Sequence, residues 1–350
     1  MAVMVTGTGF VGSYVVRDLL NAGEEVVLYG FFGGSGQPVN LDLPDLKFLD
    51  YLVGGGLFDK VKAVVGDIAE LSAVTAAIER NDVRSVVHLA SKVTTASAAN
   101  PASAIRINAE GTANVFEAAA RLKLDKVVWA SSLSVFGPKS MGPSGLITDD
   151  SPYHPQDVYG ATKVLCEQLA RSYYDTAGLD TTGLRLSRVY GFGEHVKADR
   201  GGGSSWLLRL LYDAAVGAGP SVVPFGDRNL DFHYVEDVAD AFMRALRYRD
   251  GQGRSYLTHG DYRPVAEAFD FVRGLLPDAD LTLKTGDAGL PKGYSVAWAW
   301  RYDASKAEVD LGIRSRFSME AGVYRTVNQN RLFAGLPAIP EPEALTASSP

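Results

Sequence analysis

The sequence has very little cysteine and no excess of positive charge. Cys166 is the single cysteine among 350 residues, so no disulfide can form within the chain and cysteine-ligated zinc sites are excluded. The formal net charge is −7, which argues against nucleic acid and anionic membranes as partners, because both attract basic surfaces. The five histidines form no cluster with metal-ligand spacing, so we predict no metal site.

Long hydrophobic runs are also missing. No window approaches the roughly 18 consecutive apolar residues that a membrane-spanning helix requires. The first residues, MAVMVTG, lead into a strand without a basic flank or a cleavable apolar stretch, so we expect a cytoplasmic protein. Residues 336–350 are rich in proline and small residues, and we expect them to be disordered.

Short β-branched segments alternate with alanine-rich helical segments in the first half of the chain. This alternation predicts βαβ units and a doubly wound parallel sheet of the α/β class. We predict strands at residues 2–7, 24–30, 61–67, 85–91 and 126–132, and helices at residues 12–23, 71–81, 109–122 and from about Asp157.

The alternation ends after about Leu184, where glycine-rich loops and aromatic segments take over. We therefore predict a dinucleotide-binding Rossmann domain over residues 1–184, to which the chain returns around residues 228–250. Residues 185–335 would mostly form a smaller mixed α/β lobe that binds the substrate.

A glycine-rich turn follows the first predicted strand. Gly7, Gly9 and Gly12 have G-x-G-x-x-G spacing between a strand and a helix, where glycines permit a tight turn close to a pyrophosphate. The free amides at the helix start, from Phe10 and Val11 onward, would hold that anion. The turn predicts binding of a dinucleotide.

The end of the second predicted strand bears on the choice of dinucleotide. Residues 28–31 offer no acid for the ribose hydroxyls of NAD, and no Lys or Arg stands between Gly30 and Asn40 to meet a 2′-phosphate. The missing counter-charge favours NAD. NADP remains an alternative, because a glycine at position 30 leaves room for either ribose.

Tyr159 and Lys163 are four residues apart at the start of a predicted helix, so their β-carbons lie about 5–6 Å apart on one face. A lysine ammonium near a phenol favours the phenolate, and such a tyrosine can exchange a proton with a substrate alcohol. Ser132 ends a predicted strand, at the edge where doubly wound folds bind ligands. Taken alone, Tyr159 and Lys163 could equally be a solvated surface pair. The motifs that surround them favour a catalytic role.

The chain resembles the extended short-chain dehydrogenase/reductase family of sugar-nucleotide epimerases, dehydratases and alcohol dehydrogenases. The resemblance runs from Met1 to about Arg331 and rests on the segments VTGTGFVG, VVGDIAE, VVHLAS, INAEGTANVFEAA, ASSLSVFG, DVYGATK, LRLSRVYG, DFHYVEDVADA and YDASKAEVDLG. One departure is that the family's glycine loop usually has two residues between its first two glycines, where this chain has Thr8 alone.

The resemblance implies roles for particular residues. Tyr159 would be the acid/base, Lys163 would bond the nicotinamide ribose and lower the tyrosine pKa, and Ser132 would hold the substrate oxygen. Asp67 and Ile68 would bracket the adenine, and Asn108 would support the site through its helix. The residues lining the middle of the cofactor would be Leu89, Ala90 and Ser91. The helices around residues 111–122 and 162–174 commonly form a dimer interface in this family, so we expect a homodimer.

Departures from the family bear on the substrate. Sugar-nucleotide members usually have asparagine at the position of Arg188 and arginine at that of Leu230, both addressing the diphosphate, so UDP-sugars are disfavoured. Arg228 could partly compensate for Leu230. Dehydratases carry an acid pair where this chain has Leu133 and Ser134, which argues against elimination chemistry.

The candidate substrate-binding residues are Lys92, Thr94, Ser134, Arg188 and His195. Arg188 could bind a carboxylate or form an ion pair between the two lobes, and Lys92 with Thr94 could contact substrate or belong to a solvated loop. His195 and the glycine-rich loop with Arg200 could form a mobile lid or a plain connector. His88 lies within a buried strand and is expected to be structural.

We therefore predict an NAD(P)-dependent dehydrogenase that oxidises a secondary alcohol of a small non-nucleotide substrate: a sugar, a polyol, a hydroxy acid or a hydrophobic alcohol. The alternative within enzymes is a sugar epimerase that retains its NAD. The alternative of another class is a non-catalytic regulator that binds NAD(P).

Overall fold

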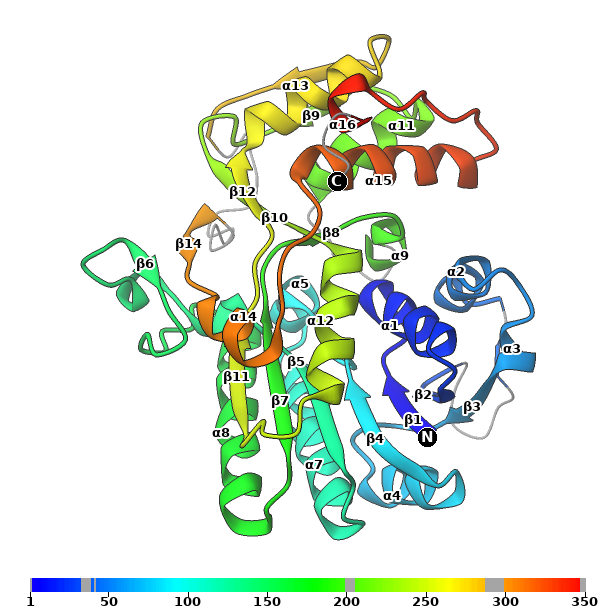
Figure 1. Cartoon of the computed structure of the whole chain (residues 1–350), viewed down its shortest axis with the longest axis vertical. Coiled ribbons are helices and arrows are strands. Elements are labelled where there is room, and N and C mark those ends of the chain that lie inside the picture. The colour runs from blue at the N-terminus through cyan, green and yellow to red at the C-terminus, as the bar shows by residue number, and fades with distance from the viewer. Residues whose placement is uncertain (1, 33–38, 41, 199–204, 287–298, 347–350) are drawn as a thin grey trace. The chain divides into compact units, whose positions relative to one another are not determined.

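The computed structural model describes residues 2–32, 39–40, 42–198, 205–286 and 299–346 (Figure 1). The chain forms two compact units. Unit 1 contains residues 1–186, 238–258 and 302–314, and unit 2 contains residues 187–237, 259–301 and 315–350. The chain thus returns twice to unit 1 after leaving it at Leu186.

Unit 1 is built on a seven-stranded sheet in the order β11-β7-β5-β4-β1-β2-β3. All neighbouring strands in this sheet run parallel, which confirms the doubly wound α/β class. The order reverses between β1 and β4, and ligands bind at such a switch point outside the carboxyl ends of the strands. The strands are β1 (Ala2–Thr6), β2 (Glu25–Gly30), β3 (Val61–Val65), β4 (Val83–His88), β5 (Lys126–Ser132), β7 (Thr181–Leu186) and β11 (Arg254–Leu257).

Helices cover both faces of this sheet. Helices α4, α7 and α8 pack on one face, where the rings of Phe116 and Trp129 lie 5.9 Å apart in the core, and Figure 1 shows α1 and α12 on the opposite face. The helical elements of unit 1 are α1 (Phe10–Asn21), α2 (Pro44–Leu52), α3 (Leu57–Lys60), α4 (Leu71–Arg80), α5 (Thr94–Ala99), α6 (Pro101–Ala104), the π-helix η1 (Ile105–Glu110), α7 (Gly111–Arg121), the 3₁₀ turns η2 (Leu133–Val135) and η3 (Pro138–Ser140), α8 (Val158–Ala177) and α14 (Ser305–Leu311), with the short strand β6 (Leu146–Ile147).

Unit 2 contains two small sheets, ordered β12-β10-β8 and β13-β9. In its core the ring centroid of Tyr190 lies 5.7 Å from that of Phe232 and 5.6 Å from that of Tyr234. Two elements, α12 (Val235–Arg247) and β14 (Arg301–Tyr302), belong partly to each unit. The other elements of unit 2 are β8 (Val189–Tyr190), α9 (Glu194–Ala198), α10 (Ser205–Leu208), the π-helix η4 (Arg209–Asp213), α11 (Ala214–Val216), β9 (Ser221–Val223), β10 (Asn229–Tyr234), β12 (Asp261–Pro264), α13 (Val265–Leu275), β13 (Leu281–Leu283), α15 (Met319–Phe333) and α16 (Glu343–Thr346).

The segment that follows α15 makes hydrogen bonds to that helix. The carbonyl oxygen of Ile339 accepts hydrogen bonds from Tyr324 and Asn328, both at 3.1 Å, and the amide of Ile339 donates to Asn328 at 2.7 Å. Ile339 is therefore anchored on α15.

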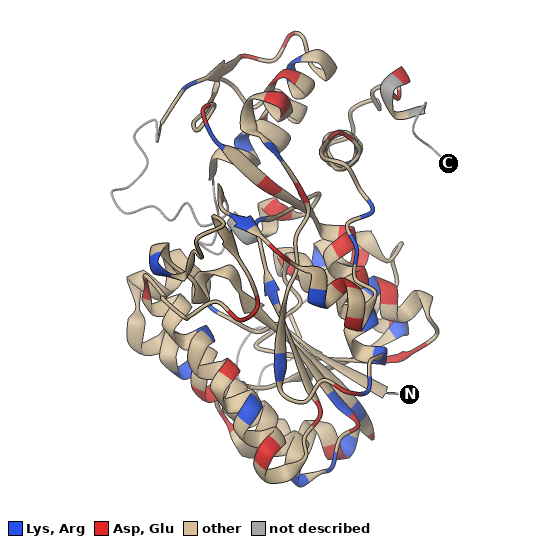
Figure 2. Cartoon of the chain, turned by 60° about the vertical axis from the view of Figure 1, so that its left-hand side comes forward, with Lys and Arg blue, Asp and Glu red and all other residues tan. Residues whose placement is uncertain are grey.

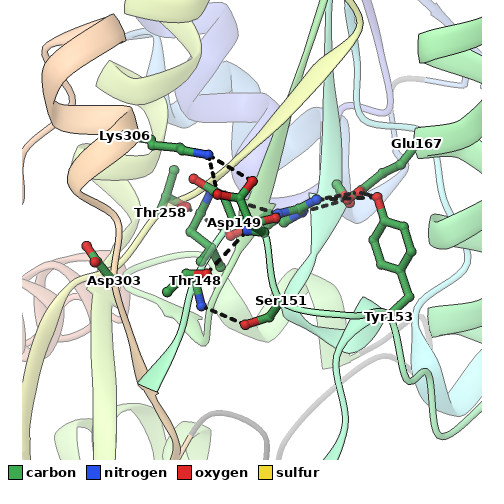
Figure 3. A network of polar contacts seen from close by, with 12 residues as sticks. Thr148, Asp149, Ser151, Tyr153, Glu167, Thr258, Asp303 and Lys306 are labelled. Carbon is green, nitrogen blue, oxygen red and sulfur yellow. Dashed lines mark hydrogen bonds and ion pairs between the residues drawn. The ribbon is translucent and has the colours of Figure 1, made fainter. Parts of the chain in front are cut away.

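A buried ion-pair network joins β5, β7 and α8 in unit 1 (Figure 3). Arg185 donates to both carboxylate oxygens of Glu167, at 2.9 and 2.7 Å, and to Asp149 at 3.0 Å. Glu167 also accepts from Ser131 at 2.5 Å and from Tyr153 at 2.6 Å. Because Ser131 directly precedes Ser132, the network fixes the strand end that carries the candidate catalytic serine.

Charge is mixed over the surface of the described chain. Acidic and basic residues are interspersed along the helices (Figure 2). None of the helices in the described chain is both long and apolar enough to cross a membrane. Within the same residues, no group of three or more His, Cys, Asp and Glu could hold a metal ion.

Candidate active site in unit 1

The glycine loop between β1 and α1 is a tight turn that leaves the start of α1 open. Gly7 has φ 83°, and a Cβ on Gly12 would lie 2.0 Å from the carbonyl oxygen of Gly7. The Ser13 hydroxyl braces the turn through the carbonyl oxygens of Thr8 and Gly9. No side chain caps the N-terminus of α1, so its first amides suit a pyrophosphate.

Gly12→Ala should weaken dinucleotide binding and cost about 1–3 kcal/mol of unfolding free energy, because the new methyl group meets backbone that cannot move aside cheaply. Gly274→Ala is the matched control, since a Cβ there has no heavy atom within 4 Å. NADH fluorescence titration and urea unfolding measure the two effects. A Gly12→Ala protein that behaves like Gly274→Ala in both would contradict this role of the loop.

Asp67 and Ile68, the residues expected near the adenine, are fixed in place by contacts with other residues of the protein. The Asp67 carboxylate accepts from the amide of Ala69 at 2.9 Å and from Arg106 at 2.8 Å. Burial alone would raise the pKa of Asp67, but these two donors lower it, so the carboxylate stays ionised. The Ile68 side chain belongs to the core against α7, where a Cβ on Gly111 would approach it to 2.7 Å. Its side chain therefore packs inward.

The end of β2 differs from what the sequence suggests. The ring of Phe32 lies 3.0 Å from the position of a Cβ on Gly30, and Phe32 is buried. The space beside Gly30, which was expected to accommodate either ribose, is thus filled by an aromatic ring. Tyr29 is buried as well and donates to the carbonyl oxygen of Asp67 at 3.0 Å.

The segment after β4 lies against the glycine loop. The amide of Leu89 donates to the carbonyl oxygen of Thr6 at 2.9 Å, and a Cβ on Gly7 would lie 2.6 Å from the nitrogen of Ala90. The Ser91 hydroxyl donates to the Asn108 amide oxygen at 3.2 Å. The structure therefore brings the residues expected along the middle of the cofactor to the switch point between β1 and β4.

Ser132, Tyr159 and Lys163 meet where β5 ends and α8 begins. The side chain of Asp157 caps α8 by accepting from the amide of Gly160 at 2.7 Å. A Cβ on Gly160 would lie 2.1 Å from the carbonyl oxygen of Ser134, so glycine is needed for this close approach. The Lys163 ammonium is 5.6 Å from the centre of the Tyr159 ring and donates to the carbonyl oxygen of Ala130 at 2.7 Å.

The electrostatics of this group differ from those of an isolated Tyr–Lys pair. Burial raises the pKa of Tyr159 to about 12, while a hydrogen bond with Ser132 acts to lower it. Burial also disfavours the charged form of Lys163, so it lowers the pKa of this residue. Removing the phenolate from water thus outweighs the hydrogen bond with Ser132. The chain alone therefore keeps Tyr159 protonated at neutral pH, and further positive charge is needed to ionise it.

Among the candidate substrate residues of unit 1, Ser134 contacts this group directly. Ser134 donates its amide to the Ser132 hydroxyl at 3.1 Å. The backbone of Lys92 is clamped by Asn108, whose amide oxygen accepts from its N–H at 2.7 Å and whose amide nitrogen donates to its carbonyl at 2.9 Å. Thr94 is exposed at the start of α5.

The candidates of unit 2 have internal partners. The side chain of Arg188 is 9% exposed and pairs with Glu194, which also belongs to unit 2. His195 stacks on Tyr212 with ring centroids 5.2 Å apart. Leu230 is fully buried and Arg228 is exposed. The expected lid with Arg200 lies outside the described residues.

Sequence reasoning missed the residues that support the catalytic group. Asp149, Glu167 and Arg185 were not singled out, although three charges near strand and helix ends could have prompted a search for a buried pair. The hydroxyls of Thr6, Thr112 and Thr162 gave no signal, because threonine is common in strands and helices alike.

The comparisons with known proteins agree with this geometry. A model of the NAD dependent epimerase/dehydratase family matches residues 3–257. The UDP-glucose 4-epimerase of Mycolicibacterium smegmatis is 30% identical over 334 residues, covering 93% of this chain and 97% of that protein.

Solved structures show the same fold at lower identity. The UDP-glucuronic acid 4-epimerase of Bacillus cereus, in complex with UDP-glucuronic acid and NAD, has a TM-score of 0.75 at 22% identity, covering 95% of this chain and 100% of that one. A monomeric L-threonine 3-dehydrogenase from a metagenome also has a TM-score of 0.75, at 19% identity, covering 95% of this chain and 99% of that one. With the family model matched over most of the chain, this protein belongs to the NAD dependent epimerase/dehydratase family.

Proposed function

We propose that this protein is an NAD-dependent sugar epimerase, which oxidises a secondary hydroxyl group and reduces the same carbon again without releasing its cofactor. The observation that carries the proposal is the grouping of Ser132, Tyr159 and Lys163 at the end of β5. Relatives named as UDP-sugar epimerases over nearly the whole chain favour the epimerase over the dehydrogenase, which the sequence alone placed first.

The residues of unit 1 fit NAD as the cofactor, because the uncapped start of α1 offers amides to a pyrophosphate and the segment after β4 lies beside it. Bound NAD would supply a hydride acceptor and a positive charge next to Tyr159. That charge favours the phenolate and opposes the rise in pKa caused by burial. Tyr159 would then accept the substrate's hydroxyl proton, and the Ser132 hydroxyl would hold the substrate oxygen.

A dehydrogenase of a small non-nucleotide substrate is the second candidate. Leu230 is fully buried and Arg188 is paired with Glu194, so neither can bond a diphosphate as the family's residues at these positions do. The similarity to an L-threonine 3-dehydrogenase shows that the fold also serves a dehydrogenase.

Product analysis separates the two candidates. The purified protein is incubated with UDP-glucose, UDP-glucuronic acid and the free sugars, with and without added NAD, and the products are resolved by NMR. An epimer formed without added NAD supports the epimerase. A ketone formed in step with reduction of added NAD supports the dehydrogenase instead.

A further inference from the structure

His88 links the strand that leads into the glycine loop with the helix that follows Asn108. It is buried at the end of β4, 3% exposed. Its Nδ1 lies 2.7 Å from the hydroxyl oxygen of Thr6, the last residue before Gly7. Its Nε2 lies 3.0 Å from the hydroxyl oxygen of Thr112 in the first turn of α7. Both ring nitrogens are therefore satisfied by hydroxyl groups.

The hydrogen bonds around His88 select one tautomer. The Thr112 hydroxyl donates to the carbonyl oxygen of Asn108 at 2.6 Å, which uses its single proton. Its oxygen must therefore accept from Nε2, so Nε2 carries the imidazole proton. Nδ1 then accepts from the Thr6 hydroxyl, whose oxygen accepts in turn from the amides of Leu89 and Ala90 at 3.3 and 3.4 Å.

His88 stays neutral in this arrangement. Burial lowers its pKa to about 3, and the nearby Lys163 ammonium acts in the same direction. A second proton on Nδ1 would also point at the Thr6 hydroxyl, which already donates to that atom. The ring is thus a fixed donor on one side and a fixed acceptor on the other across the physiological pH range.

Asn108 carries the chain of hydrogen bonds on to the catalytic helix. It lies in the π-helix η1, a distortion that often marks functional sites, and its carbonyl oxygen also accepts from the Cys166 thiol at 3.1 Å. Its side-chain nitrogen donates to the Thr162 hydroxyl oxygen at 3.3 Å. The Thr162 hydroxyl donates to the carbonyl oxygen of Tyr159 at 2.7 Å. One series of hydrogen bonds runs from Thr6 to the Asn108 carbonyl oxygen, and a second runs from the Asn108 side chain to Tyr159. In both series the donors point in the same direction along the path.

We propose that His88 is a positioning residue, which through Thr112 and Asn108 sets the orientation of Tyr159 relative to the glycine loop. This role rests on the proposed function, since it concerns the same active site. His88 itself touches neither substrate nor cofactor and transfers no proton. It acts by keeping one tautomer, which accepts from Thr6 at the end of β1 and donates to Thr112 at the start of α7.

Thr112→Val tests the link, because it keeps the shape of the side chain and removes the hydroxyl. We expect kcat to fall about tenfold, the loss typical of one buried hydrogen bond, with the Kd for NAD within about twofold. The pH limb of kcat that depends on Tyr159 should shift, and Thr112→Ser should restore both values. Thr326→Val is the matched control, since Thr326 is equally buried and also bonds the carbonyl four residues earlier.

Histidine ¹⁵N spectra and amide shifts give a readout that needs no substrate. The wild-type signal assigned to His88, which His88→Gln removes, should remain neutral and Nε2-protonated from pH 5 to 8. In Thr112→Val this tautomer should no longer be fixed, and the amide shifts of residues 158–163 should move, whereas Thr326→Val should leave both unchanged. A fixed tautomer and unmoved shifts in Thr112→Val would overturn the proposal.

Two further variants decide the matter if Thr112→Val does not fold. Gln at position 88 can imitate the Nε2 donor toward Thr112, and Asn can imitate the Nδ1 side toward Thr6. We expect His88→Gln to retain more activity than His88→Asn, and equal or reversed losses would overturn the proposal. If the wild-type protein turns over no substrate, the proposed function fails, and the spectra still decide whether His88 positions Tyr159.

Discussion

Replacing Tyr159 by phenylalanine is expected to lower turnover by roughly 10²–10⁴-fold, the range that a positioned acid/base group contributes. The ring would remain in place between Ser132 and Lys163, but no group could accept the substrate's proton. NAD binding should change little, because the glycine loop and the segment after β4 are separate from the phenol. Initial rates and a fluorescence titration of NADH measure the two quantities.

Tyr153→Phe is a suitable control for the loss of a tyrosine hydroxyl in the same unit. Tyr153 bonds Glu167 at 2.6 Å, but Glu167 keeps both hydrogen bonds from Arg185 without it. We expect a change in turnover of no more than a few-fold in this variant. A Tyr159→Phe protein whose rate matches that of Tyr153→Phe would contradict the assignment of Tyr159 as the acid/base.

Arg185→Met should destabilise the protein by about 3–5 kcal/mol, the cost of removing one partner from a buried ion pair. Arg185 is the shared partner of Asp149 and Glu167, whose side chains are 6% and 3% exposed (Figure 3). The substitution leaves two buried carboxylates without the guanidinium that pairs with both of them. Arg171→Met is the control, because Arg171 pairs with Asp175 on the surface, where a pair contributes about 1 kcal/mol or less.

The loss in Arg185→Met should depend on pH. Burial already raises the pKa of Asp149 to about 6 in the native protein, even with Arg185 beside it. Without the arginine this pKa rises further, so the folded state binds protons more readily than the unfolded state, and stability increases as the pH falls from 7 to 5. Urea unfolding at both pH values checks this, and a destabilisation that is equal at pH 5 and pH 7 would contradict the account.

Much of the fold could be predicted from the sequence because its signals are local. The glycine spacing at residues 7–12 and the β-branched strands predict the first βαβ unit directly. The helical pattern that begins near Asp157 likewise predicts the start of α8. In each case neighbouring residues determine the structure, so the pattern can be recognised without knowledge of the fold.

The rest of the site depends on residues that are distant in the sequence. Arg185 contacts Asp149 and Glu167 only when β7, α8 and the loop before α8 have packed together. No local sequence pattern predicts that contact. The pKa of Tyr159 could not be predicted in direction, since it depends on how deeply the phenol is buried. Phe32 fills the space beside Gly30 through a backbone turn that composition does not encode.

In the proposed epimerase, NAD oxidises a sugar reversibly while Tyr159 accepts and returns its hydroxyl proton within one active site. The most direct test is the nicotinamide absorbance at 340 nm when substrate is mixed with the NAD-loaded protein, recorded per active site and with Tyr159→Phe as the blank. For an epimerase we expect the absorbance to rise by at most one equivalent of NADH per site, and this rise should not grow when free NAD is added. Absorbance that accumulates well beyond one equivalent with added NAD would contradict the epimerase and establish a dehydrogenase.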